Sequence, residues 1–360
     1  MSSKVIINGR FLTQQITGVQ RYAREMVAAL DEIDSPDISF ELICPPGAEH
    51  LTALKRIQQS FHGSRGGHYW EQFELPKAAR GWPLINLCNM GPLLCRKQAV
   101  VIHDAAVFDA PHGYTWAYLT WYRMAQRILV WRGTKIITVS EFSRRQLSKA
   151  LGCSESDVSV IGCAVDHMGR VASDEAILER LNLRGQRFLL SVGSKNPNKN
   201  IASLIESMRL PGLTDIPLVL AGGSHTLVFG AGQVQELPSN VIYSGYVTDE
   251  ELVALFRHAL VFVFPSLYEG FGLPPLEAMQ QGCPVAASTA ASIPEVCGPD
   301  AAVYFDAEKP QEIASVLNQL MVDDMKRQRL AQVGHERTNE FLWSRQAEKL
   351  LALVRSRLVS

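Results

Sequence analysis

Two acidic residues eight positions apart lie in the segment VFVFPSLYEGFGLPPLEAMQQGCPVAAS, residues 261–288. A strand is predicted to end near Ser266, and a loop that contains Glu269 follows it. The two prolines after this loop favour the first turn of a helix, and Gly282 favours its end. Loop glycines let the main chain approach a ligand, and free N–H groups at a helix N-terminus bind anions. The segment therefore predicts an anion site at the end of a strand.

Glu277 falls in the first turn of this predicted helix. A carboxylate there is unfavourable beside a phosphate but suits ribose hydroxyls, whereas Glu269 in the loop is free to face the hydroxyls of a sugar. The alternative is that Glu277 stabilises the helix dipole and that the glycines are plain turn formers. One strand–loop–helix segment alone leaves both interpretations open.

A second loop, in SVGSKNPNKNIASLIESM (191–208), carries Lys195 and Lys199 between a predicted strand and a predicted helix. The two ammonium groups would lie where phosphates bind, and in a site without a metal ion lysines must neutralise a leaving diphosphate. Exposed loop lysines are usually only solvated, so this loop alone is a weak indication. Two such loops at the carboxyl ends of strands are a stronger one.

The elements that must position these loops are parallel strands alternating with helices. Short apolar, β-branched runs recur between longer helical patterns, which is typical of α/β units. Strands are predicted at 4–8, 39–45, 83–88, 99–104, 135–140, 158–166, 188–193, 217–223, 241–247, 260–266, 284–288 and 302–306. Helices are predicted after Gly18, after Ser140 as N-cap, and at about 200–209, 249–259, 274–281, 311–320 and 343–358. The pattern predicts two doubly wound α/β domains whose strand ends can face a cleft.

Composition supports two globular domains and excludes several classes of protein. The chain has 360 residues, of which 47% are hydrophobic and 20% are charged. A formal net charge of −1 argues against a dedicated nucleic-acid binder. The seven cysteines are scattered and include no C-x-x-C pair, which indicates reduced thiols. With neither a signal-peptide pattern nor a membrane-length apolar run, we expect a cytoplasmic protein.

Positive charge gathers in residues 116–149, where seven Lys and Arg residues interleave with aromatic ones. The aromatic residues are Trp116, Tyr118, Trp121, Tyr122 and Trp131. Aromatic and cationic side chains together suit an anionic membrane surface, which predicts a peripheral contact at the inner face of the cytoplasmic membrane. The alternative is a packed helix with a solvated basic face.

Several motifs, which occur along the chain in the family's order, resemble family 4 of the retaining glycosyltransferases, which have the GT-B fold. They are YEGFGLPPLEAM with the glutamate pair, VGSKNPNKN, YSGYVTDEELVALFRHA (243–259), IHD (102–104), VSEFS (139–143) and VIGCAVD (160–166), where Cys163-Ala164 replaces the usual Asn-Gly. The resemblance covers nearly the whole chain. It implies an acceptor-side Rossmann-like domain over 1–168, a nucleotide-sugar domain over 169–340, and a C-terminal helix, 341–360, that returns to the first domain.

The resemblance also implies roles for single residues. Glu269 would approach the donor sugar, Glu277 would bind the ribose, and Lys199 would neutralise the diphosphate, with Lys195 in place of the family's arginine. His103 would lie near the donor sugar and the acceptor, although a satisfied strand-end histidine is the alternative. The remaining donor-binding residues would be Gly18, Asp104, Gly223, Val247 and the amides of Gly270, Phe271, Gly272 and Leu273.

The reaction implied is hexosyl transfer with retention of the α configuration. The sequence offers no clear nucleophile, so the leaving phosphate would help to deprotonate the acceptor on the same face of the sugar. It also contains no D-x-D triplet to hold Mg²⁺ or Mn²⁺ against a diphosphate, so we expect no cofactor and no divalent metal.

Residues 8–25 and 68–76 are similar to bacterial transferases that build O-antigen lipopolysaccharide or exopolysaccharide. Many of these use GDP-mannose, so the expected donor is GDP-mannose or a GDP-deoxymannose, with a UDP-hexose as the alternative. The expected acceptor is a saccharide linked to a lipid diphosphate.

Proteins of other classes are less consistent with the sequence. An epimerase would be expected to lack the glutamate pair in this setting, and a phosphorylase usually has a longer chain. A non-catalytic two-lobed sugar or nucleotide binder stays open as an alternative. A dinucleotide dehydrogenase would need G-x-G-x-x-G after a strand, and none is present.

Overall fold

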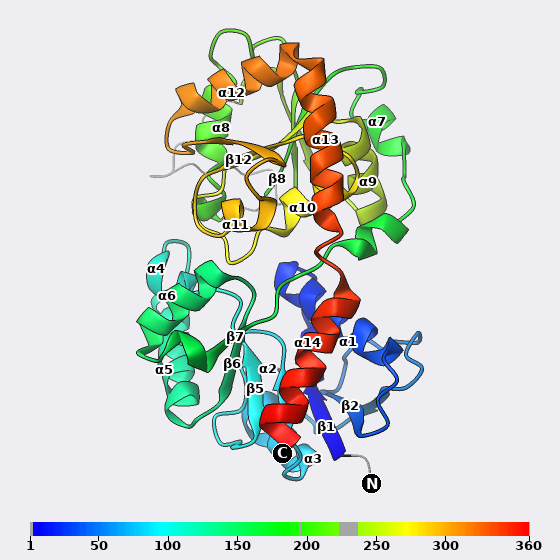
Figure 1. The fold of residues 1–360 in the computed structure, drawn as a ribbon, viewed down its shortest axis with the longest axis vertical. Helices are drawn as coiled ribbons and strands as arrows, with labels where there is room; N and C mark the ends of the chain where they lie inside the picture. Colours follow the sequence, from blue (N-terminus) through cyan, green and yellow to red (C-terminus); the bar gives the residue numbers. More distant parts are fainter. Residues whose placement is uncertain (1–2, 194–195, 223–236, 360) are drawn as a thin grey trace. The chain divides into compact units, whose positions relative to one another are not determined.

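The computed structural model describes residues 3–193, 196–222 and 237–359. The chain forms two compact units, one from Met1–Ala164 with Leu342–Ser360 and the other from Val165–Phe341. Each unit is built on its own parallel sheet (Figure 1). The predicted α/β class with two Rossmann-like halves is confirmed.

The first unit holds a seven-stranded parallel sheet in the order β3-β2-β1-β4-β5-β6-β7. Its central strands are almost wholly buried, as expected of a parallel sheet covered on both faces. The strands are β1 (Ser3–Asn8), β2 (Ile38–Cys44), β3 (Gln58–Phe61), β4 (Leu84–Asn86), β5 (Gln98–Val101), β6 (Lys135–Thr138) and β7 (Val158–Val160). Only β3 was not predicted, because the QQSF sequence of this edge strand lacks an apolar pattern.

Helices and short turns link and cover these strands. They are η1 (Gly9–Thr13), α1 (Gly18–Glu32), α2 (Gly67–Tyr69), the π-helical turn η2 (Trp70–Glu74), α3 (Leu75–Ala79), α4 (Ala106–Asp109), α5 (Trp116–Trp131), α6 (Glu141–Leu151) and η3 (Glu155–Asp157). The predicted N-cap of α6 is confirmed, because Ser140 Oγ accepts from the Ser143 N–H at 3.0 Å.

The second unit holds six parallel strands in the order β10-β9-β8-β11-β12-β13. The strands are β8 (Leu189–Val192), β9 (Leu218–Ala221), β10 (Val241–Gly245), β11 (Val261–Phe264), β12 (Val285–Ser288) and β13 (Ala302–Phe305). The helical segments are η4 (Asp166–Arg170), α7 (Ala176–Arg180), η5 (Pro197–Lys199), α8 (Ile201–Ser207), α9 (Asp249–His258), α10 (Leu273–Gln280), α11 (Ile293–Cys297), α12 (Pro310–Val322) and α13 (Asp324–Thr338).

The last helix, α14 (Trp343–Val354), belongs to the first unit and continues into η6 (Arg355–Val359). It packs along α1 (Figure 1), and the Trp343 ring meets the Tyr22 ring edge-on with centroids 5.6 Å apart. The predicted return of the C-terminal helix is thus confirmed. The units divide at 164/165 and 341/342, so the expected 168/169 boundary falls inside η4.

None of the helices in the described ranges combines the length and apolar character needed to cross a bilayer.

Candidate functional site

In the second unit, the loops after β8 and β11 lie side by side because these strands are neighbours in the sheet. The Leu267 N–H donates to the Asn198 carbonyl at 2.8 Å and ties the two loops together. Lys199 ends the short η5 in the first loop, and Glu269 lies in the second. The two loops that the sequence singled out therefore form one site at the carboxyl edge of this sheet.

Lys199 and Glu269 form an ion pair within this site. The Lys199 Nζ lies 2.6 Å from Glu269 Oε1, and the side chains are 23% and 14% exposed. The ammonium group also lies 5.3 Å from the centroid of the Phe264 ring at the end of β11. The structure thus brings together two of the residues expected to contact the donor.

Contacts with Ser292 and Phe341 hold the loop 269–272 in place. Ser292 Oγ lies 2.9 Å from the carbonyl oxygens of both Glu269 and Phe271, and the buried Phe271 ring packs edge-on against Phe341. Gly272 has φ of +102°, a conformation that favours glycine. The amides of Phe271, Gly272 and Leu273 donate to no other group in the described ranges. Free amides at the start of a helix can bind an anion, so the predicted anion site stays a prediction that this geometry permits.

The position of Glu277 differs from the prediction. α10 begins at Leu273 rather than Pro274, because Gly272 in its left-handed conformation precedes the helix and the prolines occupy its next two positions. Glu277 therefore lies in the second turn and is 8% exposed. The helix dipole acts mainly over the first turn, so it does not by itself account for a buried carboxylate here.

Close contacts also join the loops after β8 and β9 to each other and to β10. A Cβ atom on Gly222, which has φ of +97°, would lie 2.9 Å from the Gly193 carbonyl oxygen. The Tyr243 hydroxyl donates to the Gly222 carbonyl at 2.7 Å. Val247 is half-buried just before Thr248, the N-cap of α9. Two expected site residues, Lys195 and Gly223, lie outside the described residues.

In the first unit, His103 follows β5 and is 6% exposed. Its main-chain N–H donates to Asn89 Oδ1 at 2.7 Å, and its ring Nε2 lies 2.9 Å from the Leu87 carbonyl oxygen. Burial lowers the pKa of His103 to about 4, so the ring is neutral near pH 7. Because a carbonyl only accepts, Nε2 carries the proton and Nδ1 is left as an acceptor. The Nε2 side of the ring is thus satisfied by the main chain, as the alternative interpretation expected. Nδ1 accepts no hydrogen bond from a described residue.

Comparison with known proteins agrees with this geometry. Residues 173–337 match the family model "Glycosyl transferases group 1", and residues 16–168 match "Glycosyltransferase Family 4". The chain is 30% identical to O-antigen chain mannosyltransferase B of Escherichia coli over 94% of its own length and 96% of that protein. The chain is a family 4 glycosyltransferase. Over 56% of its length it is also 31% identical to the serotype-specific mannosyltransferase WbdA of Escherichia coli, a match that covers 24% of that protein.

Solved structures place the glycosyltransferase in the GT-B fold. Sucrose-phosphate synthase from Thermosynechococcus elongatus matches 98% of the chain and 98% of that protein with a TM-score of 0.73 and 18% identity. Anabaena Alr3699/HepE in complex with UDP and glucose matches 98% of the chain and all of that protein, with a TM-score of 0.73 and 16% identity.

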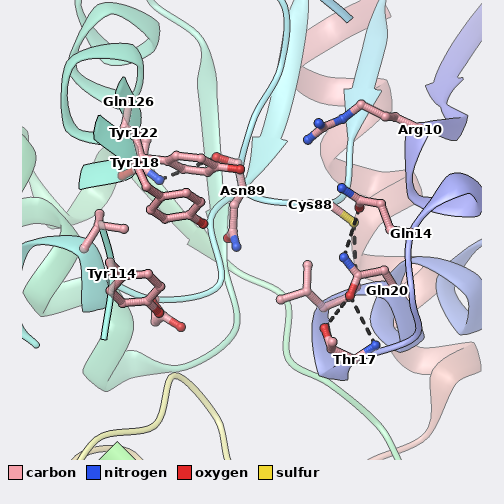
Figure 2. A pocket seen from close by; sticks show the side chains of 13 residues that line it. Arg10, Gln14, Thr17, Gln20, Cys88, Asn89, Tyr114, Tyr118, Tyr122 and Gln126 are labelled. Carbon is pink, nitrogen blue, oxygen red and sulfur yellow. Dashed lines mark hydrogen bonds between the residues drawn. The ribbon is translucent and has the colours of Figure 1, made fainter. Parts of the chain in front are cut away.

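The first unit of the transferase contains a pocket of about 350 Å³ beyond the carboxyl ends of β1, β4 and β5 (Figure 2). Its lining comes from the segment before and in α1, from the loops after β4 and β5, and from α5. The residues are Arg10, Gln14, Thr17, Val19, Gln20, Cys88, Asn89, Asp104, Val107, Tyr114, Tyr118, Tyr122 and Gln126. The expected residue Asp104 thus lines this pocket, and Gly18, the first residue of α1, lies between two of its lining residues.

Sequence reasoning missed most of this pocket. Tyr118, Tyr122 and Gln126 follow one another at intervals of four residues on one face of α5, and Tyr114 lies one interval earlier, just before the helix begins. That spacing was a usable signal. Tyr118 and Tyr122 were instead grouped with the tryptophans as one aromatic and basic stretch. In the structure both tyrosines line the pocket, whereas Trp116 and Trp131 are 79% and 82% exposed.

Proposed function

We propose that this glycosyltransferase transfers a mannosyl or deoxymannosyl group from a GDP-sugar to a saccharide acceptor in bacterial surface polysaccharide synthesis, with retention of the α configuration and without a divalent metal. The observation that carries the proposal is the Lys199–Glu269 pair beside the free amides of α10. The mannosyltransferase names of the two curated relatives favour mannose and O-antigen synthesis.

In the proposed complex, the diphosphate binds the amides at the start of α10 and the Lys199 ammonium. Glu277 holds the ribose, and Glu269 binds hydroxyls of the donor sugar once the diphosphate takes over Lys199. The bond between the anomeric carbon and the phosphate oxygen breaks while the acceptor oxygen bonds to the same face of that carbon. The acceptor proton passes to the leaving phosphate, whose negative charge Lys199 and the amides stabilise.

A UDP-hexose is the second candidate donor, because the Anabaena protein of the same fold was solved with UDP and glucose. The two donors are separated by assaying GDP-mannose, GDP-deoxymannose and UDP-hexoses against lipid-linked acceptors. We expect turnover with a GDP-sugar, an α-linked product by NMR, and activity that persists in EDTA. Turnover with UDP-sugars alone would replace the donor, and loss in EDTA with recovery on adding Mn²⁺ would refute the metal-free route.

The non-catalytic alternative makes a different prediction for the same assay. A two-lobed binding protein would take up GDP or a sugar without forming a new glycosidic bond. Tight binding of GDP-mannose with no product from any acceptor in the panel would support that alternative over the transferase.

We further propose that the outer face of α5 contacts anionic lipid, which would bring the enzyme to a lipid-linked acceptor. Trp116, Met124, Arg127 and Trp131 lie along one exposed stripe of α5, which contains no acidic residue. Exposed aromatic side chains beside uncompensated basic ones match the chemistry of an anionic interface.

The lipid contact is tested by co-sedimentation with phosphatidylcholine vesicles that contain or lack phosphatidylglycerol. Replacing both Trp116 and Trp131 with Ala should reduce binding to the anionic vesicles. Arg144→Gln is the matched control, because its guanidinium is already paired with Glu141 at 2.5 Å. Equal binding by the double variant would favour a solvated face instead.

A further inference from the structure

A second pocket in the first unit, of about 610 Å³, lies on the sheet face against which α3 packs through Leu75 and Ala79. Lys4 and Ile6 of β1 line it together with Glu41 of β2, which is the partner of Ile6 in the parallel register. This α3 pocket shares no lining residue with the pocket beyond β1, β4 and β5. Its volume lies in the range of small-molecule sites.

The rim of the α3 pocket that follows β3 is held in place by Glu74. The Glu74 carboxylate accepts hydrogen bonds from the main-chain N–H groups of Ser64 and Arg65 at 3.1 and 3.2 Å. Gly63 precedes them with φ of +89°, and a Cβ atom there would overlap the same carboxylate. The rim is therefore formed before any ligand arrives, which lowers the entropic cost of binding.

The two carboxylates that line the α3 pocket are already occupied, but two of its cations are not. Glu74 holds the rim, and Glu41 forms an ion pair with Lys4. Lys77 and Arg80 also line the pocket. Neither side chain has a hydrogen-bond or ion-pair partner among the described residues. The two uncompensated positive charges favour an anionic ligand.

The end of α3 brings Arg80 and Trp82 to the same pocket. Arg80 directly follows α3 with φ of +49°, a conformation that few residues other than glycine adopt. The chain turns there, and the Trp82 N–H donates to the Ala79 carbonyl at 2.9 Å. Trp82 lines the pocket and is 46% exposed. An exposed indole beside uncompensated cations offers a ring contact to the same ligand.

We propose that the α3 pocket binds a small phosphate monoester that carries a ring, with its phosphate at Lys77 and Arg80 and its ring against Trp82. A phosphate monoester carries about two negative charges near pH 7 and so matches two cations, whereas a carboxylate carries only one. An arginine can also donate two parallel hydrogen bonds to phosphate oxygens. The inference does not rest on the proposed function, because none of these three residues takes part in the proposed transfer.

The test is isothermal titration calorimetry on the full chain, with GDP present so that a nucleotide site in the second unit is occupied. The probes are mannose 6-phosphate, AMP, inorganic phosphate and dioctanoyl phosphatidic acid, a lipid whose phosphate carries no ring. We expect the two ring phosphates to bind more tightly than the other two probes.

Lys77→Ala and Arg80→Gln should each weaken the binding of both ring phosphates about tenfold, because each removes a charge-assisted contact. Arg80→Gly removes the same charge and suits the left-handed conformation, so it should fold normally and bind as weakly as Arg80→Gln. Trp82→Ala should weaken the ring phosphates about fivefold and leave inorganic phosphate unchanged. Arg65→Gln is the matched control, because Arg65 is exposed beside the pocket but does not line it.

Thermal unfolding followed by circular dichroism shows that each variant is folded. Wild-type protein that binds neither ring phosphate would overturn the proposal, as would binding that Lys77→Ala and both Arg80 variants leave unchanged. Inorganic phosphate that binds as tightly as the ring phosphates would show an unspecific anion site and refute the ring contact. Tighter binding of phosphatidic acid than of either ring phosphate would replace the metabolite with a lipid headgroup. Failure of the proposed function is seen separately, in the transfer assay.

Discussion

At the scale of single residues, the transferase pairs two charges to which the proposed reaction gives different tasks. Lys199 and Glu269 lie 2.6 Å apart in the second unit. A partly buried ion pair is costly to break by removing one partner, because the other charge is left uncompensated. We therefore expect the pair to keep both side chains ordered at the loop edge, and under the proposed function a diphosphate would compete for the ammonium group.

Lys199→Ala should lower kcat by about 10²- to 10³-fold, the range seen when one preorganised stabilising group is removed. Steady-state kinetics with a GDP-sugar measure this loss. Lys309→Ala is the control, since Lys309 also forms a lysine–glutamate pair, at 2.9 Å from Glu312, but is 58% exposed. Near-normal kcat for Lys199→Ala would remove this residue from the site.

His103 should make the stability of the first unit depend on pH. The pKa of His103 is about 4 in the folded protein and ordinarily 6.5. Between pH 4 and 6.5 its ring is therefore protonated in the unfolded chain but neutral in the folded one. The free energy of unfolding should therefore fall as the pH drops from 6.5 to 4, by up to about 3 kcal/mol. All six tryptophans belong to the first unit, so urea unfolding followed by tryptophan fluorescence reports on it.

His103→Gln should lack this part of the pH dependence, and the exposed His112→Gln should keep it. Parallel pH profiles for wild type and His103→Gln would show that His103 is not protected from protonation in the folded state.

At the scale of elements, α10 is buried on most of its surface and is held against α13. The contact depends on Gly334 of α13, where a Cβ atom would lie 2.9 Å from Met279 Cγ. The N-terminus of α10, with its free amides, is thus fixed by packing at the far side of the helix.

Gly334→Ala tests this packing. Helix propensity alone would stabilise the variant by about 1 kcal/mol, but overpacking costs about 1–3 kcal/mol and should dominate. We expect a lower unfolding midpoint by circular dichroism and weaker GDP binding. Gln332→Ala, exposed on the same helix, should not be destabilised. A more stable Gly334→Ala protein would mean that Met279 moves aside freely.

The sequence predicted most of the elements because buried parallel strands carry continuous apolar runs. It did not predict β3 or α13, since QQSF is polar and DMKRQRLAQVGHERT has little apolar periodicity. The Lys199 and Glu269 loops were found because each follows an apolar strand. The tyrosine pocket was missed because its lining comes from segments more than 100 residues apart, and only folding brings Arg10 and Gln126 to one cavity. The predicted start of α10 was wrong by one residue, because Gly272 adopts a left-handed conformation and the helix begins directly after it at Leu273.

At the scale of the whole molecule, the first unit is made of two separate pieces of chain. α14 supplies Trp343, which is 2% exposed and contacts the buried Tyr22 of α1. The Tyr22 ring in turn meets His103 edge-on at 4.9 Å. The end of the chain therefore completes the core that supports His103.

Trp343→Ala should lower the free energy of unfolding of the first unit by about 3–5 kcal/mol, the cost of truncating a large buried aromatic side chain. Urea unfolding followed by the five remaining tryptophans measures the change. Arg357→Ala, exposed near the same terminus, should unfold like wild type. An unchanged midpoint for Trp343→Ala would show that α14 contributes little to this core.

The divided first unit has a consequence for biosynthesis. The ribosome completes Val165–Phe341 as one uninterrupted stretch, so the second unit can finish folding while the first unit still lacks α14. The first unit is therefore the last to be completed. The α1 surface that α14 covers stays exposed until α14 has emerged from the ribosome. Truncation of the chain before α14 would leave that apolar surface to chaperones and proteases.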